Sequence, residues 1–318
     1  MEKGDKSMRE ERVFSANLFG MILLILFSIA PIIFGRVFKI LNIPRGLDIV
    51  VLQVSLLLVP TIIYFIITKQ SVKEVLRLKK INIKSVFIII IIGFLAQPIT
   101  VFLSLITQFI FPNKIGMVIS QLNTMPLILQ VAIVALTPAI LEEITMRGIV
   151  LSGYKNVDIK KAAIITGLFF CMIHRDGNQS LYTFAFGVLF AYLVEITGSI
   201  FSSMICHFTI NGSQVVLAFI SNKIIGARAG GQELYSKGIH SVPYTQLMVA
   251  VVVWFIIALI FLKILMIFMK KLIKVNKYEQ INNNNEYTKN QKVLNWPFYV
   301  SLVIYIITII TEVVYIYK

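Results

Sequence analysis

The sequence contains few charged residues. Asp, Glu, Lys and Arg make up only 14% of its 318 residues, while hydrophobic residues make up 58%. An ordinary soluble domain has about 25% charged and 45–50% apolar residues. The mean hydropathy of +0.85 is an apolar excess that one soluble core cannot bury, because such cores stop growing at about 250–300 residues. The composition therefore excludes a soluble globular protein and predicts that lipid surrounds most of the chain.

Cysteine is also scarce, which excludes a second class of protein. The two cysteines, Cys171 and Cys206, both lie in apolar segments, so the disulfide framework of a small secreted domain is not indicated. The net charge is +15, but the charges lie mostly between long apolar runs. This is the pattern of a membrane protein with positively charged cytoplasmic loops, and we expect no nucleic-acid partner.

Long apolar runs define the predicted fold. A helix that spans the hydrocarbon core needs about 20 residues. Polar residues interrupt several of the runs, so that eight or nine spans fit the pattern, and we adopt nine: 14–34, 48–68, 85–110, 126–152, 162–178, 180–196, 199–220, 246–269 and 296–317. The predicted fold is an all-α, polytopic transmembrane helical bundle in a cell membrane. Lys and Arg are in excess on the loops that lie on the same side of the membrane as the N-terminus, which predicts that the N-terminus is cytoplasmic.

The same pattern divides the chain into four parts. Residues 1–13 form a basic cytoplasmic leader, which the uncleaved first helix follows. Residues 14–275 form the multi-spanning domain. Residues 276–295 are an Asn-rich linker, too polar to bury, and residues 296–318 form an additional C-terminal transmembrane helix. Because the linker separates it from the other spans, this last helix is predicted to be an appendage.

Ionisable residues inside predicted spans are the candidate functional residues. A charge at membrane depth costs about 2.5–3.5 kcal/mol even on the gentler scales, so such residues indicate function. Three acids, Asp48, Glu195 and Glu312, lie near span ends, where we expect water to solvate them. The deeper ionisable residues are Glu142, Glu143, Arg147, His174 and His207.

Glu142, Glu143 and Arg147 share one predicted helix. Glu143 and Arg147 are four residues apart, with the acid first, which favours an ion pair on one helix face. Glu142 is rotated by about 100° from Glu143 and is left free for chemistry. Pro138 lies four residues before Glu142 and predicts a kink near this point.

Two further helices carry the histidines. One has Phe170 and His174 four residues apart, and the next but one has His207 and Asn211 at the same spacing. At 1.5 Å per residue, Glu142, His174 and His207 lie roughly 12–18 Å from the same membrane face. A carboxylate, two imidazoles and an amide are therefore predicted to meet near the midplane, as in an active site.

Two chemistries suit this set of side chains, and both end in hydrolysis of a peptide bond. In one, His174 and His207, with Glu142, hold a zinc ion that activates water. In the other, no metal is needed: Glu142 and His174 deprotonate a water, and His207 and Asn211 stabilise the oxyanion. The sequence has no HExxH, G-x-S-x-G or GxGD motif, and a thiol in an apolar setting is a poor nucleophile.

The order EExxxR, FxxxH and HxxxN on hydrophobic helices resembles the CAAX protease and bacteriocin-processing (CPBP, or Abi) family. The resemblance covers about residues 126–220 and implies an eight-helix intramembrane endopeptidase. By position, it implies that Glu142 is the general base, that His174 activates the same water and that Arg147 holds Glu143. Members are described as metalloproteases, and a metal-free, glutamate-dependent mechanism is also argued for them. The C-terminal helix at 296–318 is an addition to the eight-helix plan.

The expected substrate is a peptide or a membrane protein, as in peptide processing. The Ile-, Lys- and Asn-rich composition is typical of an AT-rich bacterial genome, where protein prenylation is not expected. The alternative is a non-enzymatic bacteriocin self-immunity or scaffold protein, or a proton-coupled transporter that uses the Glu and His residues as a relay. Loss of function in a Glu142 variant separates an enzyme from a scaffold, and proton-coupled flux identifies a transporter.

Overall fold

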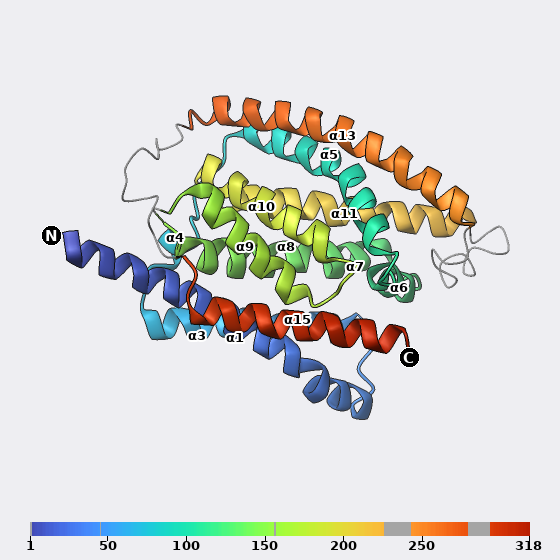
Figure 1. The fold of residues 1–318 in the computed structure, drawn as a ribbon, viewed down its shortest axis with the longest axis horizontal. Coiled ribbons are helices and arrows are strands. Elements are labelled where there is room, and N and C mark those ends of the chain that lie inside the picture. The colour runs from blue at the N-terminus through green and yellow to red at the C-terminus, as the bar shows by residue number, and fades with distance from the viewer. Residues whose placement is uncertain (1, 45, 156, 226–242, 279–292) are drawn as a thin grey trace.

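The computed structural model describes residues 2–44, 46–155, 157–225, 243–278 and 293–318, and within these ranges it contains helices and no strand. The long helices lie side by side in layers, with α13 (Tyr244–Val275) and α5 (Ile83–Thr107) along one side and α1 (Glu2–Ile40) and α15 (Trp296–Ile316) along the other (Figure 1). The remaining elements, most of them between these layers, are α2 (Leu47–Gln53), η1 (Val54–Leu58), α3 (Val59–Thr68), α4 (Val72–Val75), α6 (Lys114–Gln121), α7 (Leu127–Val131), η2 (Ala132–Leu136), α8 (Thr137–Glu143), η3 (Ile144–Val150), α9 (Ile159–His174), α10 (Ser180–Thr197) and α11 (Phe201–Ile225). The segments η1, η2 and η3 are π-helical.

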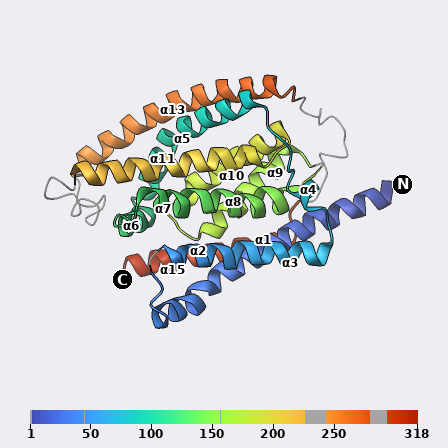
Figure 2. The same cartoon turned by 180° about the vertical axis from the view of Figure 1, so that it is seen from behind.

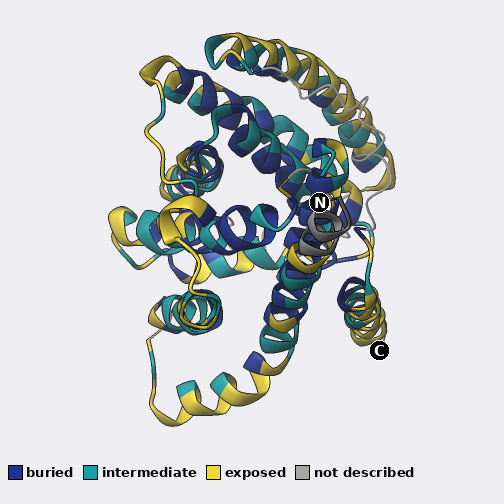
Figure 3. Ribbon diagram, turned by 90° about the vertical axis from the view of Figure 1, so that its left-hand side faces the viewer, coloured by how far each residue is buried: buried dark blue, intermediate teal, exposed yellow. Residues whose placement is uncertain are grey.

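Buried residues gather where these helices face one another, while the outer faces of the bundle are exposed and apolar (Figure 3). The outer helix α13 shows this arrangement, because large apolar residues such as Val249, Phe255 and Ile267 are exposed on it. An apolar surface of this kind is what a lipid environment requires. The predicted all-α polytopic bundle is confirmed.

Eight helices in the described part of the chain are long and apolar enough to cross a membrane, one fewer than predicted. The difference lies at predicted span 162–178. Helix α9 has 16 residues and ends at His174, which gives a length of about 24 Å against the roughly 30 Å hydrocarbon core. It ends there because Arg175 adopts a left-handed conformation, with φ of 51°, and Asp176 Oδ1 accepts the N–H of Asn178 in the following turn. The predicted ninth full-length span is therefore wrong, and most residues of α9 are buried inside the bundle.

The structure describes most of the predicted N-terminal leader but only part of the predicted C-terminal linker. Helix α1 begins at Glu2, so the predicted leader 1–13 continues the first helix instead of preceding it. Of the predicted linker 276–295, residues 279–292 lie outside the described residues. The final predicted span is present as helix α15.

Helix α15 is joined to the rest of the bundle at its N-terminal end. Asn17 of α1 donates from Nδ2 to the carbonyl oxygen of Val293, over 3.0 Å, and to Asn295 Oδ1, over 2.9 Å. Tyr154 in turn donates its hydroxyl to Asn17 Oδ1. Helices α1 and α15 lie side by side in the front view (Figure 1) and in the view from behind (Figure 2).

The C-terminal end of α15 is anchored as firmly. Glu312 accepts the backbone N–H of Gly177 at Oε2, over 2.9 Å, and forms an ion pair with Lys114. Its side chain is only 9% exposed, so the expectation that water solvates it is wrong. The predicted appendage is thus an integral helix, and its carboxylate holds the loop that follows His174.

Helices α9 and α10 approach so closely that only glycine fits between them. A Cβ built on Gly187 would lie 2.5 Å from Gly167 Cα, closer than carbon atoms can approach without a shift of backbone. Small residues of this kind allow two membrane helices to pack tightly. This contact places Phe170 of α9 and Phe190 of α10 in one buried layer, with ring centroids 6.2 Å apart.

Replacing Gly187 with Ala is therefore expected to destabilise the purified protein by about 1–3 kcal/mol, the usual cost of overpacking. Thermal unfolding in detergent measures the effect as a lower Tm. Gly35→Ala on α1 is the matched control, because a Cβ at Gly35 has no atom within 4 Å. Equal Tm values for the two variants would contradict the close packing.

Two of the π-helical segments end two residues before a proline. Segment η1 precedes Pro60 and segment η2 precedes Pro138. Proline clashes with the carbonyl group four residues earlier and cannot donate to it, and the wider π turn gives that carbonyl group room. The helix type thus changes locally just before Pro138, where the sequence predicts a kink. Pro138 leaves the carbonyl oxygen of Val134 without its α-helical donor, and Asn211 Nδ2 lies 3.2 Å from this oxygen.

Candidate active site

The buried end of the candidate site is an ion pair on one helix. Glu143 closes α8 and Arg147 lies in η3. Arg147 Nη1 is 3.2 Å from Glu143 Oε1, and both side chains are 0% exposed. The pair predicted from the four-residue spacing is present.

Aromatic rings cover the Arg147 guanidinium. Its central carbon lies 4.2 Å from the ring centroid of Phe170 and 5.0 Å from that of Phe190. The three guanidinium nitrogens form no aligned hydrogen bond with any described residue, so the cation is stabilised by the Glu143 charge and by the two ring faces. The sequence motif identified Phe170. It did not identify Phe190, because nothing in the spacing along α10 marks that residue.

Glu143 also binds the first of the two site histidines. His207 Nδ1 lies 2.9 Å from Glu143 Oε1, and Asn211 Nδ2 lies 3.1 Å from His207 Nε2. The same Asn211 nitrogen lies within hydrogen-bond distance of the Val134 carbonyl oxygen, which can only accept. These contacts assign a neutral His207 whose Nδ1–H donates to Glu143 and whose Nε2 accepts from Asn211.

The second histidine faces the other carboxylate. His174 Nδ1 lies 2.6 Å from the carbonyl oxygen of Phe170, so this nitrogen carries the proton and leaves Nε2 with its lone pair. His174 Nε2 is 3.9 Å from Glu142 Oε2, and the two side chains are 17% and 15% exposed. Glu142 Oε2 has no hydrogen-bond partner among the described residues. Glu142 and His174 are therefore partly accessible, whereas Glu143 is enclosed.

Phe170 lies between the two halves of the site. Its ring centroid is 4.7 Å from that of His174 and 6.0 Å from that of His207. His207 is also stacked on Phe190, with centroids 5.2 Å apart. The structure thus brings all seven predicted site residues together from three segments of the chain: Glu142, Glu143, Arg147, Phe170, His174, His207 and Asn211.

The predicted metal ligands His174, His207 and Glu142 do not fit a zinc ion in this arrangement. Both ring nitrogens of His207 already have partners. His174 offers only Nε2, together with the carboxylate of Glu142, and zinc sites take at least three protein ligands. Across the described ranges, no group of three or more His, Cys, Asp or Glu side chains is arranged to hold a metal ion. The mechanism proposed below therefore uses none.

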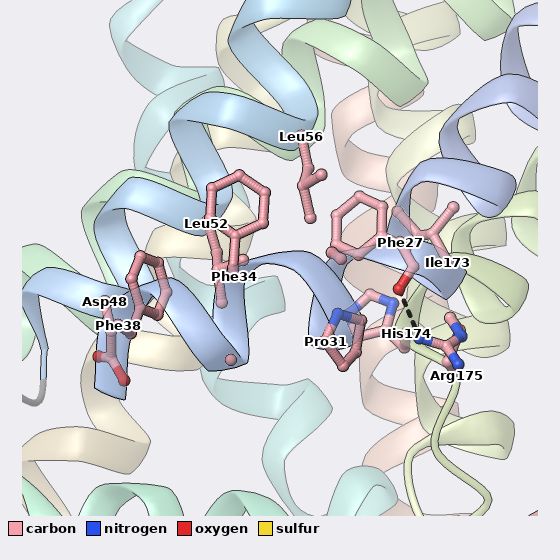
Figure 4. A pocket seen from close by; sticks show the side chains of 12 residues that line it. Phe27, Pro31, Phe34, Phe38, Asp48, Leu52, Leu56, Ile173, His174 and Arg175 are labelled. Atoms are coloured by element: carbon pink, nitrogen blue, oxygen red, sulfur yellow. Dashed lines mark hydrogen bonds between the residues drawn. The ribbon is translucent and has the colours of Figure 1, made fainter. Parts of the chain in front are cut away.

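A cavity of about 470 Å³ reaches the His174 side chain. It lies between the C-terminal half of α1, the segment α2–η1 and the end of α9 (Figure 4). Its walls are Phe27, Ala30, Pro31, Phe34, Gly35, Phe38, Asp48, Leu52, Leu56, Ile173, His174 and Arg175. In Figure 4, His174 and Arg175 lie next to each other in this wall, and Arg175 Nη1 donates to the Phe27 carbonyl oxygen. Sequence reasoning missed Arg175, although it directly follows a motif residue.

Residues 124–213 match the family model described as type II CAAX prenyl endopeptidase Rce1-like. No curated protein and no solved structure matches the chain. The matched segment includes the three motifs from Glu142 to Asn211, and it confirms the predicted resemblance to the CPBP family. The segment that carries the candidate site is thus similar to the Rce1-like family of CAAX-type intramembrane proteases, and it lies within a multi-pass membrane protein.

Proposed function

We propose that this protein is an intramembrane endopeptidase that hydrolyses peptide bonds with a water activated by Glu142 and His174. The observation that carries the proposal is the placement of these two groups. They face each other at 3.9 Å, too far for a direct hydrogen bond, and His174 lies in the wall of a cavity. A water about 2.8 Å from each atom can bind both at once.

The neighbouring carboxylates of Glu142 and Glu143 have different contacts, and this difference supports the same mechanism. Glu143 is committed to Arg147 and His207, whereas Glu142 keeps an oxygen without a described partner. In the proposed reaction, Glu142 takes a proton from the water and the hydroxide adds to the peptide carbonyl carbon. The proton then passes to the leaving nitrogen as the C–N bond breaks.

The series of hydrogen bonds that joins Glu143, His207 and Asn211 is suited to stabilising the developing oxyanion. Glu143 holds the His207 ring through Nδ1–H, as a carboxylate holds the histidine of a serine protease. In the proposed reaction, His207 takes up a proton from solvent at Nε2 as the negative charge develops on the substrate oxygen, and it returns that proton to solvent when the oxyanion collapses. While Nε2 is protonated, His207 Nε2–H and the Asn211 amide both donate to the oxyanion. Fixed donors of this kind stabilise an oxyanion strongly in a dry site.

The substrate in this proposal is a peptide or a membrane protein, and the proposed reaction uses no metal or organic cofactor. The excess of Lys and Arg on the loops of the N-terminal side supports a cytoplasmic N-terminus.

The proposal is tested by comparing protein and peptide termini, by mass spectrometry, in cells that produce the wild type or His174→Ala at equal membrane levels. Termini generated by the wild type should vanish in the variant, because the water then lacks one of its two bases. Lys263→Gln is the control, since Lys263 is exposed on α13 and should leave every terminus in place. Identical termini in all three cell lines would contradict the protease and favour the scaffold or transporter alternative.

A further inference from the structure

The cation beside His174, Arg175, has no counter-ion among the described residues. Arg147 is paired with Glu143, Arg77 with Glu195, and Lys114 with Glu312. Arg175, in contrast, forms no ion pair with any residue that the structure describes, and its buried Nε has no hydrogen-bond partner there. Its one described hydrogen bond is from Nη1 to the carbonyl oxygen of Phe27. Most of its donors are therefore left for a ligand.

Apolar side chains form most of the cavity wall around Arg175. Its polar side chains are Asp48, His174 and Arg175. Asp48 accepts at Oδ1 from the backbone N–H groups of Gly46 and Ile49 and lies at the opposite end of the view from Arg175 (Figure 4). Ligand cavities commonly combine apolar walls with a few polar groups that fix orientation. In this cavity wall, the polar group next to His174 is the Arg175 guanidinium, which has no described carboxylate partner.

The backbone holds Arg175 in a fixed place. Its left-handed conformation, with φ of 51°, is uncommon for a bulky residue and persists only where the surroundings impose it. The turn that follows supplies this constraint. Asp176 Oδ1 accepts from Asn178 N over 2.9 Å and from Gln179 N over 3.2 Å, and Glu312 accepts from Gly177 N. The guanidinium is thus presented to the cavity by a preorganised turn.

We propose that Arg175 determines specificity by binding a carboxylate of the peptide substrate, while apolar side chains of that peptide occupy the cavity. Arginine binds carboxylates through paired, charge-assisted hydrogen bonds, and an apolar setting strengthens them. The inference rests on the proposed function, because a peptide is the ligand that must reach His174. A lipid phosphate offers similar chemistry and is the competing occupant.

The test uses the purified full-length protein in nanodiscs and a library of quenched fluorescent peptides with apolar residues. The library is made in two forms, one ending in a free carboxylate and one in an amide. The wild type is expected to prefer the acid by about tenfold or more in kcat/KM, as for one hydrogen bond to a charged group. Arg175→Met should lower this ratio to near one by slowing cleavage of the acid alone, and Arg175→Lys should retain part of the preference. Lys263→Met is the control and should keep the wild-type ratio.

A binding measurement separates this inference from the protease proposal. The acid and amide forms of the peptides are titrated onto Glu142→Gln and onto the double variant Glu142→Gln/Arg175→Met. This measurement does not require either variant to cleave the peptide. Tighter binding of the acid to the single variant alone supports the carboxylate site even if no peptide is cleaved. An unchanged acid preference in the Arg175 variant, or an equal loss for acid and amide, overturns it. If acid and amide bind equally and phosphatidylglycerol raises the Tm of the wild type but not of Arg175→Met, the occupant is a lipid and the proposal is wrong.

Discussion

Replacing Glu142 with Gln is expected to reduce kcat for a cleaved peptide by about 10²–10⁴-fold, the usual contribution of a positioned general base. The substitution keeps the size of the side chain and its capacity to bind water, but the amide cannot take a proton. Because Glu142 Oε2 has no described hydrogen-bond partner, the substitution breaks no described hydrogen bond of this oxygen. The amount of folded protein in the membrane and its Tm should stay near the wild-type values.

Glu143→Gln is the matched comparison, because it changes the adjacent residue in the same way. Glu143 is completely buried and contacts both Arg147 and His207, so removing its charge should lower the Tm. Kinetics of peptide cleavage and thermal unfolding of both variants distinguish the two roles. Substantial turnover by Glu142→Gln, or a fall in its Tm as large as that of Glu143→Gln, would contradict the assignment of Glu142 as the base.

The architecture could be predicted from the sequence where hydrophobic length alone determines it. Eight apolar runs became eight long helices because a lipid environment leaves each backbone amide to be satisfied within its own helix. The end of α9 could not be predicted in this way. The residue that stops it is Arg175 in a left-handed conformation, and arginine carries no signal for that conformation, whereas a glycine would.

The site could be predicted from local spacing, but its internal contacts could not. Four-residue spacing predicted the Glu143–Arg147 pair because both residues share one helix face. The bond between His207 and Glu143 joins residues 64 positions apart and depends on how two helices pack. The role of α15 was missed for the same reason, since Glu312 meets the Gly177 backbone across 135 positions.

The second large effect is expected at Arg147. Replacing it with Ala leaves the Glu143 carboxylate buried without its cation, and breaking a buried ion pair in this way costs about 3–5 kcal/mol. The substitution also removes the guanidinium from the faces of Phe170 and Phe190 and leaves a void in the core. Arg147→Ala should therefore lower both the folded yield and the activity, measured by the fluorescence of a tagged protein after size-exclusion chromatography and by peptide cleavage.

Two further variants separate the charge of Arg147 from its shape. Arg147→Lys keeps the charge but loses the planar group that stacks on the rings, so its stability should lie between those of the wild type and Arg147→Ala. The double variant Arg147→Ala/Glu143→Gln removes both charges and should be more stable than Arg147→Ala alone, because no unpaired carboxylate remains buried. The cycle of single and double variants measures this coupling directly. Additive losses, or a normal yield of active Arg147→Ala protein, would show that the pair does not hold the site together.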